Sequence, residues 1–323
     1  MSDRSNSDPK SIPHPSGLVL PQVPESQLEL GLPRVQESDR NLHLGGRSFY
    51  FFDFDDNVAF LSTALILFHK ETGEELAINS GQYARENQNI GVRGVFQDYE
   101  RRWDDTTGTY RNFRDHDNGM LEKLGMKTQI FLQDLAAALG QPDFHWKGPS
   151  WSCFYHATFN QRPVSVITAR GHHPSTVKDG IGLWVDSGYL PQAPNYLSVF
   201  PVSHPQVRLD LGDHDLKLSV AELKQKAIRA SLEMAIRTYG YNPHHRFGMS
   251  DDDPRNIQLI VEEMRRLKTD YPELSFFMIE THGGDFTKHE ITHTGLRSQV
   301  VHANDSGATQ ALLFDDNETK KKA

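Results

Sequence analysis

Several features that would assign the chain to a specialised class are missing from its sequence. There is one cysteine, Cys153, among 323 residues, so an internal disulfide is excluded and a cysteine-based zinc site is not expected. No apolar run reaches the roughly eighteen residues of a membrane-spanning helix. The first residues, MSDRSNSDPK, lack the apolar segment of a secretory signal peptide. We therefore expect a cytoplasmic protein that does not enter a membrane.

Positive charge is also in short supply. The chain has 34 Lys and Arg against 43 Asp and Glu, and its formal net charge is -9. Nucleic acids and anionic membranes attract basic surfaces, so the composition favours neither as a partner. Hydrophobic residues make up 37% of the chain, which is enough for a packed core.

The two ends of the chain differ from its middle. Residues 1–44 are rich in Ser, Pro and charge, and residues 297–323 end in DDNETKKKA. Such segments hold too little apolar surface to form a core. We expect a disordered N-terminal arm, a disordered C-terminal tail and one folded domain at 45–296.

Within this domain, predicted strands alternate with predicted helices. The strands are expected at 47–54, within PVSVITARG (163–171), at 196–203, at about 245–249 and at 275–281, with SFFMIET (275–281) as the last core strand. The helices are expected at 119–140, 149–160, 174–188, and after Ser219 and Asp253. Ser219-Val-Ala-Glu222 is a capping box, which marks a helix start. The alternation predicts an α/β fold with a Rossmann-like parallel sheet and helices on both faces.

Two additional elements follow the first strand. Residues 64–81 contain two β-prone segments around Glu71-Thr-Gly-Glu74, which predicts a β-hairpin flap. Residues 82–118 are polar but carry scattered aromatics and arginines, and we interpret them as a small cap-like insert. The arginines that could meet a substrate anion there are Arg93, Arg101, Arg111 and Arg114.

Polar residues follow three of the predicted strands. Asp53 and Asp55 follow the first, Thr168 ends the second, and a cluster at 251–253 follows a later one. Ligand sites of open α/β sheets form at the carboxyl ends of the strands, so these groups are expected to meet. Clustered carboxylates suit Mg²⁺, a hard cation that prefers oxygen ligands.

The order of these motifs resembles the haloacid dehalogenase-like (HAD) phosphohydrolase superfamily over about 47–285. The resemblance implies that Asp53 is a nucleophile that accepts a phosphoryl group. Asp55 would be the general acid that protonates the leaving oxygen and then the base that activates water. Its backbone carbonyl would also touch the metal. Thr168 would hydrogen-bond a phosphoryl oxygen.

The resemblance also requires a lysine that holds the nucleophile and the phosphoryl group together. Lys224 and Lys226 are both candidates on the helix after Ser219. Lys224 is favoured because its neighbours at i+3 and i+4, Ala227 and Ile228, are apolar and are expected to face the core.

The acidic cluster supplies the remaining metal ligands. Asp253 precedes Pro254, the pattern of a helix N-cap, which leaves Asp251 and Asp252 for the metal. Alignment to the family pattern favours Asp252 as the principal ligand and puts Asn256 where the family has a second acidic residue. A second departure is Asn57, where the family most often has Thr or Val.

The histidine pairs His172-His173 and His244-His245 do not have good zinc spacing. We interpret them as loop or surface residues. His172 or His173 is the better candidate to line the site, because both follow Thr168.

The leading hypothesis is a Mg²⁺-dependent phosphohydrolase that acts on a phosphorylated small molecule or macromolecule through an aspartyl-phosphate intermediate. One alternative is a metal-dependent glycosyltransferase in which Asp53 and Asp55 hold Mn²⁺ and a nucleotide sugar. Another is a noncatalytic HAD-like binding module.

Overall fold

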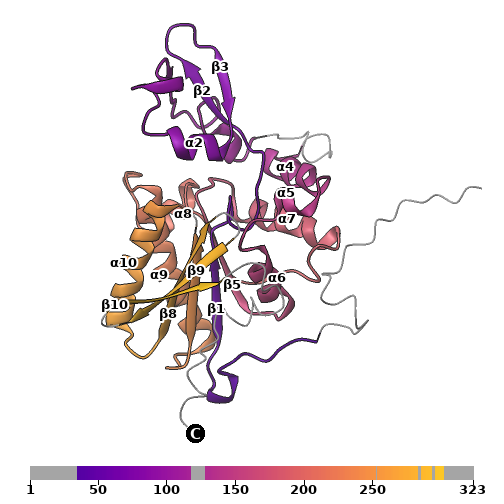
Figure 1. The fold of residues 1–323 in the computed structure, drawn as a ribbon, viewed down its shortest axis with the longest axis vertical. Helices are drawn as coiled ribbons and strands as arrows, with labels where there is room; N and C mark the ends of the chain where they lie inside the picture. The colour runs from indigo at the N-terminus through magenta and orange to yellow at the C-terminus, as the bar shows by residue number, and fades with distance from the viewer. Residues whose placement is uncertain (1–34, 118–127, 252, 283–284, 293–294, 302–323) are drawn as a thin grey trace, which may run out of the picture. The chain divides into compact units, whose positions relative to one another are not determined.

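The computed structural model of the protein describes residues 35–117, 128–251, 253–282, 285–292 and 295–301. Its centre is a seven-stranded sheet in the order β10-β9-β8-β7-β1-β5-β6 (Figure 1). The strands are β1 (Ser48–Phe52), β5 (Pro163–Thr168), β6 (Asn195–Pro201), β7 (Arg246–Asp251), β8 (Ser275–His282), β9 (Asp285–Thr292) and β10 (Gly295–Val301).

The five strands from β8 to β6 are parallel, and β1 lies in their middle. In register, Phe51 pairs with Ser165 of β5 on one side and with Met249 of β7 on the other. From β1 the chain builds β5 and β6 on one side of the sheet, then returns to build β7 and β8 on the other. The α/β prediction is therefore confirmed, and the reversal of strand order falls at β1.

The prediction that 275–281 is the last core strand is wrong. β9 follows β8 and pairs with it in antiparallel fashion, and β10 pairs with β9 in the same way, which makes the sheet mixed. Their sequences, DFTKHEIT and GLRSQVV, alternate polar and apolar residues weakly. These two strands, of which β10 is the edge of the sheet, lack the continuous apolar run that identifies a strand buried on both faces.

Helices cover both faces of the sheet (Figure 1). One face carries α4 (Ile130–Leu139), α5 (Asp143–Trp146), α6 (Trp151–Phe159) and α7 (Pro174–Asp186). The other carries α8 (Pro205–Asp210), α9 (Val220–Tyr239) and α10 (Pro254–Asp270). Side chains of β1 alternate between the two cores, with Tyr50 and Phe52 in the first and Phe49 and Phe51 in the second. This double burial explains the apolar run before Asp53.

A separate three-stranded antiparallel sheet, β3-β2-β4, lies between β1 and α4 in sequence. Its elements are β2 (Leu65–His69), β3 (Glu75–Ile78), α2 (Ser80–Glu86), η2 (Gly94–Phe96), β4 (Tyr99–Glu100) and η3 (Arg111–Phe113). β2 and β3 form the hairpin of the predicted flap. Leu65, Leu67, Ile78, Ile90 and Phe96 form one apolar cluster, so the flap and the insert make a single small unit.

The boundaries of the domain are set by contacts at both ends. Residues 35–44, assigned from sequence to the arm, contact the domain: Ser48 N donates to Asp39 Oδ2 at 2.9 Å, and Glu37 N donates to Asn160 Oδ1 at 2.7 Å. At the other end, β10 includes the first residues of the predicted tail. The rest of the arm and tail, residues 1–34 and 302–323, lie outside the described residues, as does 118–127 of the predicted helix 119–140.

Candidate active site

The two aspartates of the opening motif lie on a tight turn after β1. Asp53 N donates to Ser250 O of β7 at 3.0 Å, so the pairing of β1 continues up to the first aspartate. The turn then closes through hydrogen bonds from Val58 N and Ala59 N to Phe54 O, and Asp56 takes a positive φ of 57°. Asp53 is buried, with 6% of its surface exposed. The turn therefore presents Asp53 and Asp55 at the carboxyl end of the central strand, next to the reversal of strand order where open α/β sheets bind ligands.

Lys224 lies between Asp53 and Asp251. Its Nζ is 3.1 Å from Asp53 Oδ1 and 2.7 Å from Asp251 Oδ2, and its side chain is 1% exposed. Burial lowers the pKa of Lys224, but the carboxylates of Asp251 and Asp53 raise it by more, so the net pKa lies above the ordinary lysine value. The lysine therefore remains a cation that joins α9 to the ends of β1 and β7.

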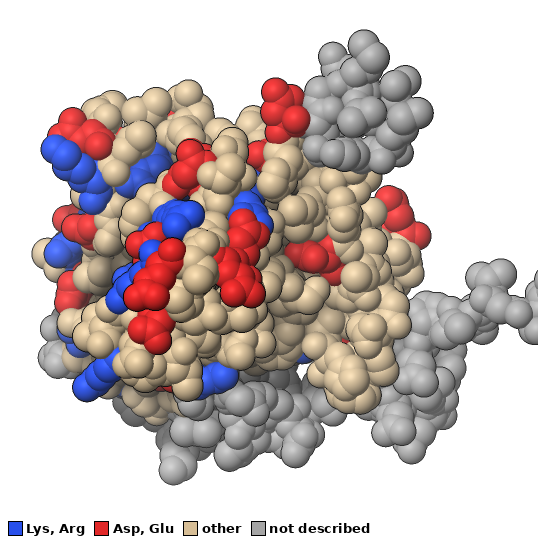
Figure 2. Space-filling view, turned by 90° about the horizontal axis from the view of Figure 1, so that it is seen from above, with Lys and Arg blue, Asp and Glu red and all other residues tan. Residues whose placement is uncertain are grey.

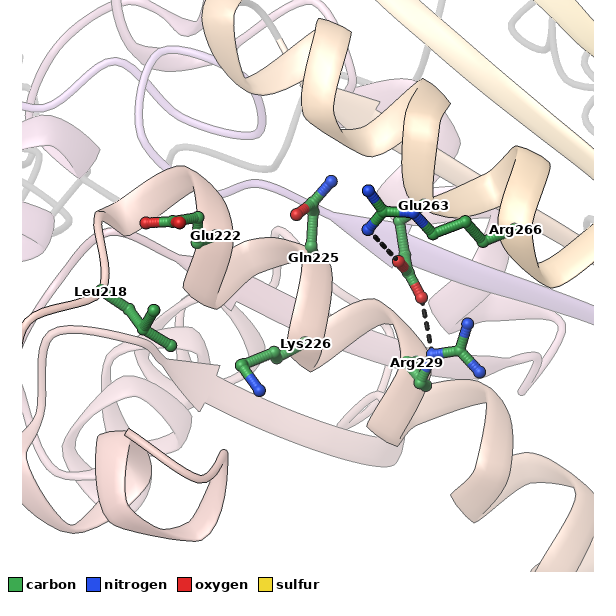
Figure 3. A pocket seen from close by; sticks show the side chains of 7 residues that line it. All are labelled: Leu218, Glu222, Gln225, Lys226, Arg229, Glu263 and Arg266. Carbon is green, nitrogen blue, oxygen red and sulfur yellow. Dashed lines mark hydrogen bonds and ion pairs between the residues drawn. The ribbon is translucent and has the colours of Figure 1, made fainter. Parts of the chain in front are cut away.

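Lys226, the alternative lysine, lies on a different face of α9. It is exposed and lines a pocket together with Leu218, Glu222, Gln225, Arg229, Glu263 and Arg266 (Figure 3). In that pocket Glu263 accepts from Arg229 Nε at 2.7 Å and from Arg266 Nη1 at 3.4 Å. Of the two lysines, Lys224 is the one that the structure brings to the aspartates.

Asp55 points toward β5. Its carboxylate accepts from Arg170 Nε at 2.9 Å and from Arg170 Nη2 at 2.6 Å, and Thr168 Oγ1 lies 3.3 Å from its Oδ2. Arg170 is fully buried, whereas the side chain of Asp55 remains 23% exposed. The structure thus brings Asp55 and Thr168 together as predicted from the strand ends, and adds Arg170, which sequence reasoning missed. The Thr168-Ala-Arg170 sequence held the signal, because a cation two residues after a buried strand end can reach the carboxylate of a neighbouring strand.

Asn57, the departure from the family pattern, connects four elements at the base of this turn. Its Nδ2 donates to Asp53 O at 3.1 Å and to Ser250 Oγ at 2.7 Å. Its Oδ1 accepts from Ser150 Oγ at 2.8 Å and from Thr281 Oγ1 at 3.1 Å. The side chain is fully buried. A residue with both an amide donor and an amide acceptor is needed here, since Thr or Val could not serve both sets of partners.

Asp251 joins Lys224 to the start of α10. Its Oδ2 accepts from Lys224, and its Oδ1 accepts from Asp253 N at 3.0 Å and from Asn256 Nδ2 at 3.2 Å. Both carboxylate oxygens are therefore engaged in joining the lysine to the start of α10. Asn256, at the position where the family pattern has a second acidic residue, donates to Asp251. Asp252 lies outside the described residues.

The other candidate metal ligands at the site are oxygen atoms, which a hard cation prefers. They are the Asp53 carboxylate and the main-chain carbonyl of Asp55, both on the turn after β1. Among the residues that the structure describes, no group of three His, Cys, Asp or Glu is placed to hold a metal ion. A Mg²⁺ site at this turn would therefore need Asp252 to complete it.

Two of the four paired histidines are buried, against the interpretation as loop or surface residues. His172 is fully buried against Phe131, with ring centroids 5.2 Å apart. His245 is 1% exposed and accepts from Arg47 N through Nδ1 at 3.0 Å. His173 caps α7 by accepting from Ser175 N at 3.2 Å. The two histidines of each pair differ in burial because consecutive side chains point in different directions, so their adjacency in the sequence did not show which one is buried.

The arginines of the insert contact groups within or beside it. Arg111 makes a bidentate pair with Glu75, at 2.9 and 2.7 Å. Arg114 pairs with Asp105 at 3.0 Å, Arg93 Nε donates to Asn89 Oδ1 at 2.8 Å, and Arg101 approaches the hydroxyl of Tyr83 at 3.5 Å. On the face shown in Figure 2, Lys and Arg side chains lie among Asp and Glu side chains.

Comparisons with known proteins assign no family. The chain matches no protein-family model, no curated protein and no solved structure. Over the described part of the chain, no helix combines the length and apolar character needed to cross a membrane. The site's own geometry is therefore the basis for a functional proposal.

Proposed function

We propose that the protein is a HAD-like, Mg²⁺-dependent phosphohydrolase that works through an aspartyl-phosphate intermediate. The observation that carries the proposal is the arrangement at the end of β1. There Asp53 contacts the buried cation Lys224, while Asp55, two residues on, faces Thr168 and Arg170. The two carboxylates lie in different environments, and this difference would suit one to act as a nucleophile and the other as a general acid and base.

In the first step, a carboxylate oxygen of Asp53 attacks the phosphorus of a phosphate monoester. The bond between phosphorus and the leaving oxygen breaks, and Asp55 transfers its proton to that oxygen. The enzyme then carries a phosphoryl group on Asp53 and an ionised Asp55.

In the second step, Asp55 accepts a proton from water as the water oxygen attacks phosphorus. The bond between phosphorus and Asp53 breaks, inorganic phosphate leaves, and both aspartates return to their starting states. Protons and charges balance over the cycle.

The remaining residues position groups and compensate charge, which is the main requirement of phosphoryl transfer. Lys224 lies beside Asp53 and would attract the phosphoryl oxygens as they approach. Thr168 Oγ1 is placed to donate to one of those oxygens in exchange for its contact with Asp55. Asp251 holds the ammonium group of Lys224 in place next to Asp53.

The Mg²⁺ ion would be held by the Asp53 carboxylate, the main-chain carbonyl of Asp55 and Asp252. When bound, it would supply positive charge to the oxygens of the phosphoryl group. The unit formed by the flap and insert begins about ten residues after Asp55 in the sequence. It would exclude water from the site and select the substrate. The substrate is a phosphorylated small molecule or macromolecule, and we place the activity in the cytoplasm.

The experiment that tests the proposal is phosphate release from a panel of phosphorylated metabolites and phosphopeptides, with and without Mg²⁺. Asp53→Asn keeps the size of the side chain but removes its charge, and we expect metal-dependent release to fall by a factor of at least about 1,000. Asp186→Asn, on the exposed end of α7, is the matched control and should retain full activity.

Release that survives in Asp53→Asn would overturn the assignment of the nucleophile. No release from any member of the panel, together with transfer from a nucleotide sugar in the presence of Mn²⁺, would support the glycosyltransferase alternative. Binding of phosphate analogues without turnover would support the noncatalytic module.

A further inference from the structure

Arg170 contacts four separate parts of the structure at once. Its Nε and Nη2 hold the Asp55 carboxylate at 2.9 and 2.6 Å, and Nη2 also donates to Thr63 Oγ1 at 2.9 Å. Its guanidinium carbon lies over the rings of both Phe113 and Phe131, 4.8 and 4.5 Å from their centroids. Arg170 is fully buried, so these contacts are made away from solvent screening.

Thr63 and Phe113 lie on the two chain segments that connect the core to the flap and insert. Thr63 precedes β2, and Phe113 ends η3 at the exit from the unit. Each segment is also fixed to the core directly. Thr63 Oγ1 donates to Asp134 Oδ2 of α4 at 2.6 Å, and Gly171 N donates to Phe113 O at 2.8 Å.

We propose that Arg170 is a positioning residue that couples these two connecting segments to the orientation of the Asp55 carboxylate. A guanidinium is planar and rigid, so it cannot follow one partner without turning relative to the others. A shift of Phe113 or Thr63, such as movement of the flap and insert would produce, must therefore reach Asp55 through Arg170. The inference rests on the proposed role of Asp55 as the general acid.

The coupling makes a prediction about leaving groups. A nitrophenolate leaves easily as an anion and needs little help from an acid, whereas an alkoxide needs a proton as it leaves. Misplacing Asp55 should therefore slow the hydrolysis of an alkyl phosphate far more than that of p-nitrophenyl phosphate. A purely structural role for Arg170 would slow both substrates by the same factor.

The test compares kcat and KM of wild type, Arg170→Lys and Phe113→Leu with both substrates. For Arg170→Lys we expect kcat on the alkyl phosphate to fall by about 100-fold, the typical cost of a misplaced catalytic group, and by less than about 5-fold on p-nitrophenyl phosphate. KM should change little in either case. Phe113→Leu should show the same pattern with a smaller loss, because it removes one of the two rings that contact the guanidinium but leaves the ion pair with Asp55.

Arg208→Lys is the matched control, since Arg208 also pairs with a buried aspartate, Asp213, but between β6 and α9. Arg208→Lys should not change the ratio of kcat on the alkyl phosphate to kcat on p-nitrophenyl phosphate. Equal losses on both substrates in Arg170→Lys, or no loss, would overturn the inference while leaving the proposed function intact.

If the wild-type protein hydrolyses neither ester, the proposed function fails first. The coupling is then measured by hydrogen exchange of the backbone amides at 54–59. Phe113→Leu should accelerate their exchange relative to Arg208→Lys if the coupling exists, and unchanged exchange would refute it.

Discussion

At the scale of single residues, the site is organised by two buried cations that each hold a carboxylate from the end of β1. Lys224 joins Asp53 to Asp251, and Arg170 holds Asp55. Removing water from charges is unfavourable, and each buried cation is tolerated because oxygens of opposite charge surround it. The same pairing keeps Asp53 and Asp251, which come from neighbouring strands, from repelling one another.

Lys224→Met tests this balance. The substitution leaves Asp53 and Asp251 as buried carboxylates without their shared cation, and we expect the free energy of unfolding to fall by about 3–5 kcal/mol. Chemical denaturation followed by circular dichroism measures the change. Lys226→Met, two residues along the same helix but exposed to solvent, should change stability by less than about 0.5 kcal/mol. Equal effects of the two substitutions would contradict the assignment of Lys224 to the buried site.

At the scale of elements, helix ends place the functional side chains. The capping box of Ser219 and Glu222 fixes the start of α9, and Lys224 projects from its second turn. Asp251 performs a comparable task for α10 by accepting from Asp253 N. Asn57 fixes the turn after β1 through hydrogen bonds to Ser250 of β7, to Thr281 of β8 and to Ser150 before α6.

Ser219→Ala removes the hydroxyl that accepts from Glu222 N and donates to the Glu222 carboxylate. Loss of an N-cap of this kind is expected to cost about 1 kcal/mol of stability. Thermal and urea unfolding should both detect the loss. Ser187→Ala, at the exposed C-terminal end of α7, is the control and should be close to neutral. A neutral Ser219→Ala would mean that packing alone determines where α9 begins.

At the scale of the whole molecule, stability depends on histidines that the fold keeps neutral. Burial, then the neighbouring charge of Arg170, lowers the pKa of His172, and burial also lowers the pKa values of His204 and His245. A group whose pKa is lower in the folded protein than in the unfolded chain contributes stability above its unfolded pKa. That contribution is lost as the pH falls. Asp56 and Asp134 act in the opposite sense at lower pH, because burial raises their pKa values.

Stability should therefore decrease as the pH falls from about 7 toward 5, the range in which an unfolded histidine gains its proton. Below the pKa of an unfolded histidine, each buried neutral histidine lowers the free energy of unfolding by up to about 1.4 kcal/mol per pH unit. Urea midpoints measured across this range would give the slope. His172→Phe should reduce the slope, whereas His214→Gln, at an exposed site, should leave it unchanged. A slope that is the same in wild type and His172→Phe would show that His172 does not titrate on unfolding.

Local sequence determined the features that depend on near neighbours. The apolar run before Asp53 predicted a strand buried on both faces, the Ser219 capping box predicted the start of α9, and the apolar neighbours of Lys224 predicted that it faces inward. In each case the deciding information lies within a few residues, because strand and helix periodicity determine which side of an element a residue occupies.

Tertiary structure decided the individual partners of these groups. Arg170 lies 115 residues from Asp55, and Lys224 lies 27 residues from Asp251, so local periodicity could not show that these residues pair. β9 and β10 were missed because the position of a weakly patterned strand depends on the strand that it pairs with more than on its own residues. The burial of His172 depends likewise on its packing against Phe131 of α4, which no local pattern specifies. Periodicity assigns a residue to a face of its own element, and only the order in which the elements pack determines what that face contacts.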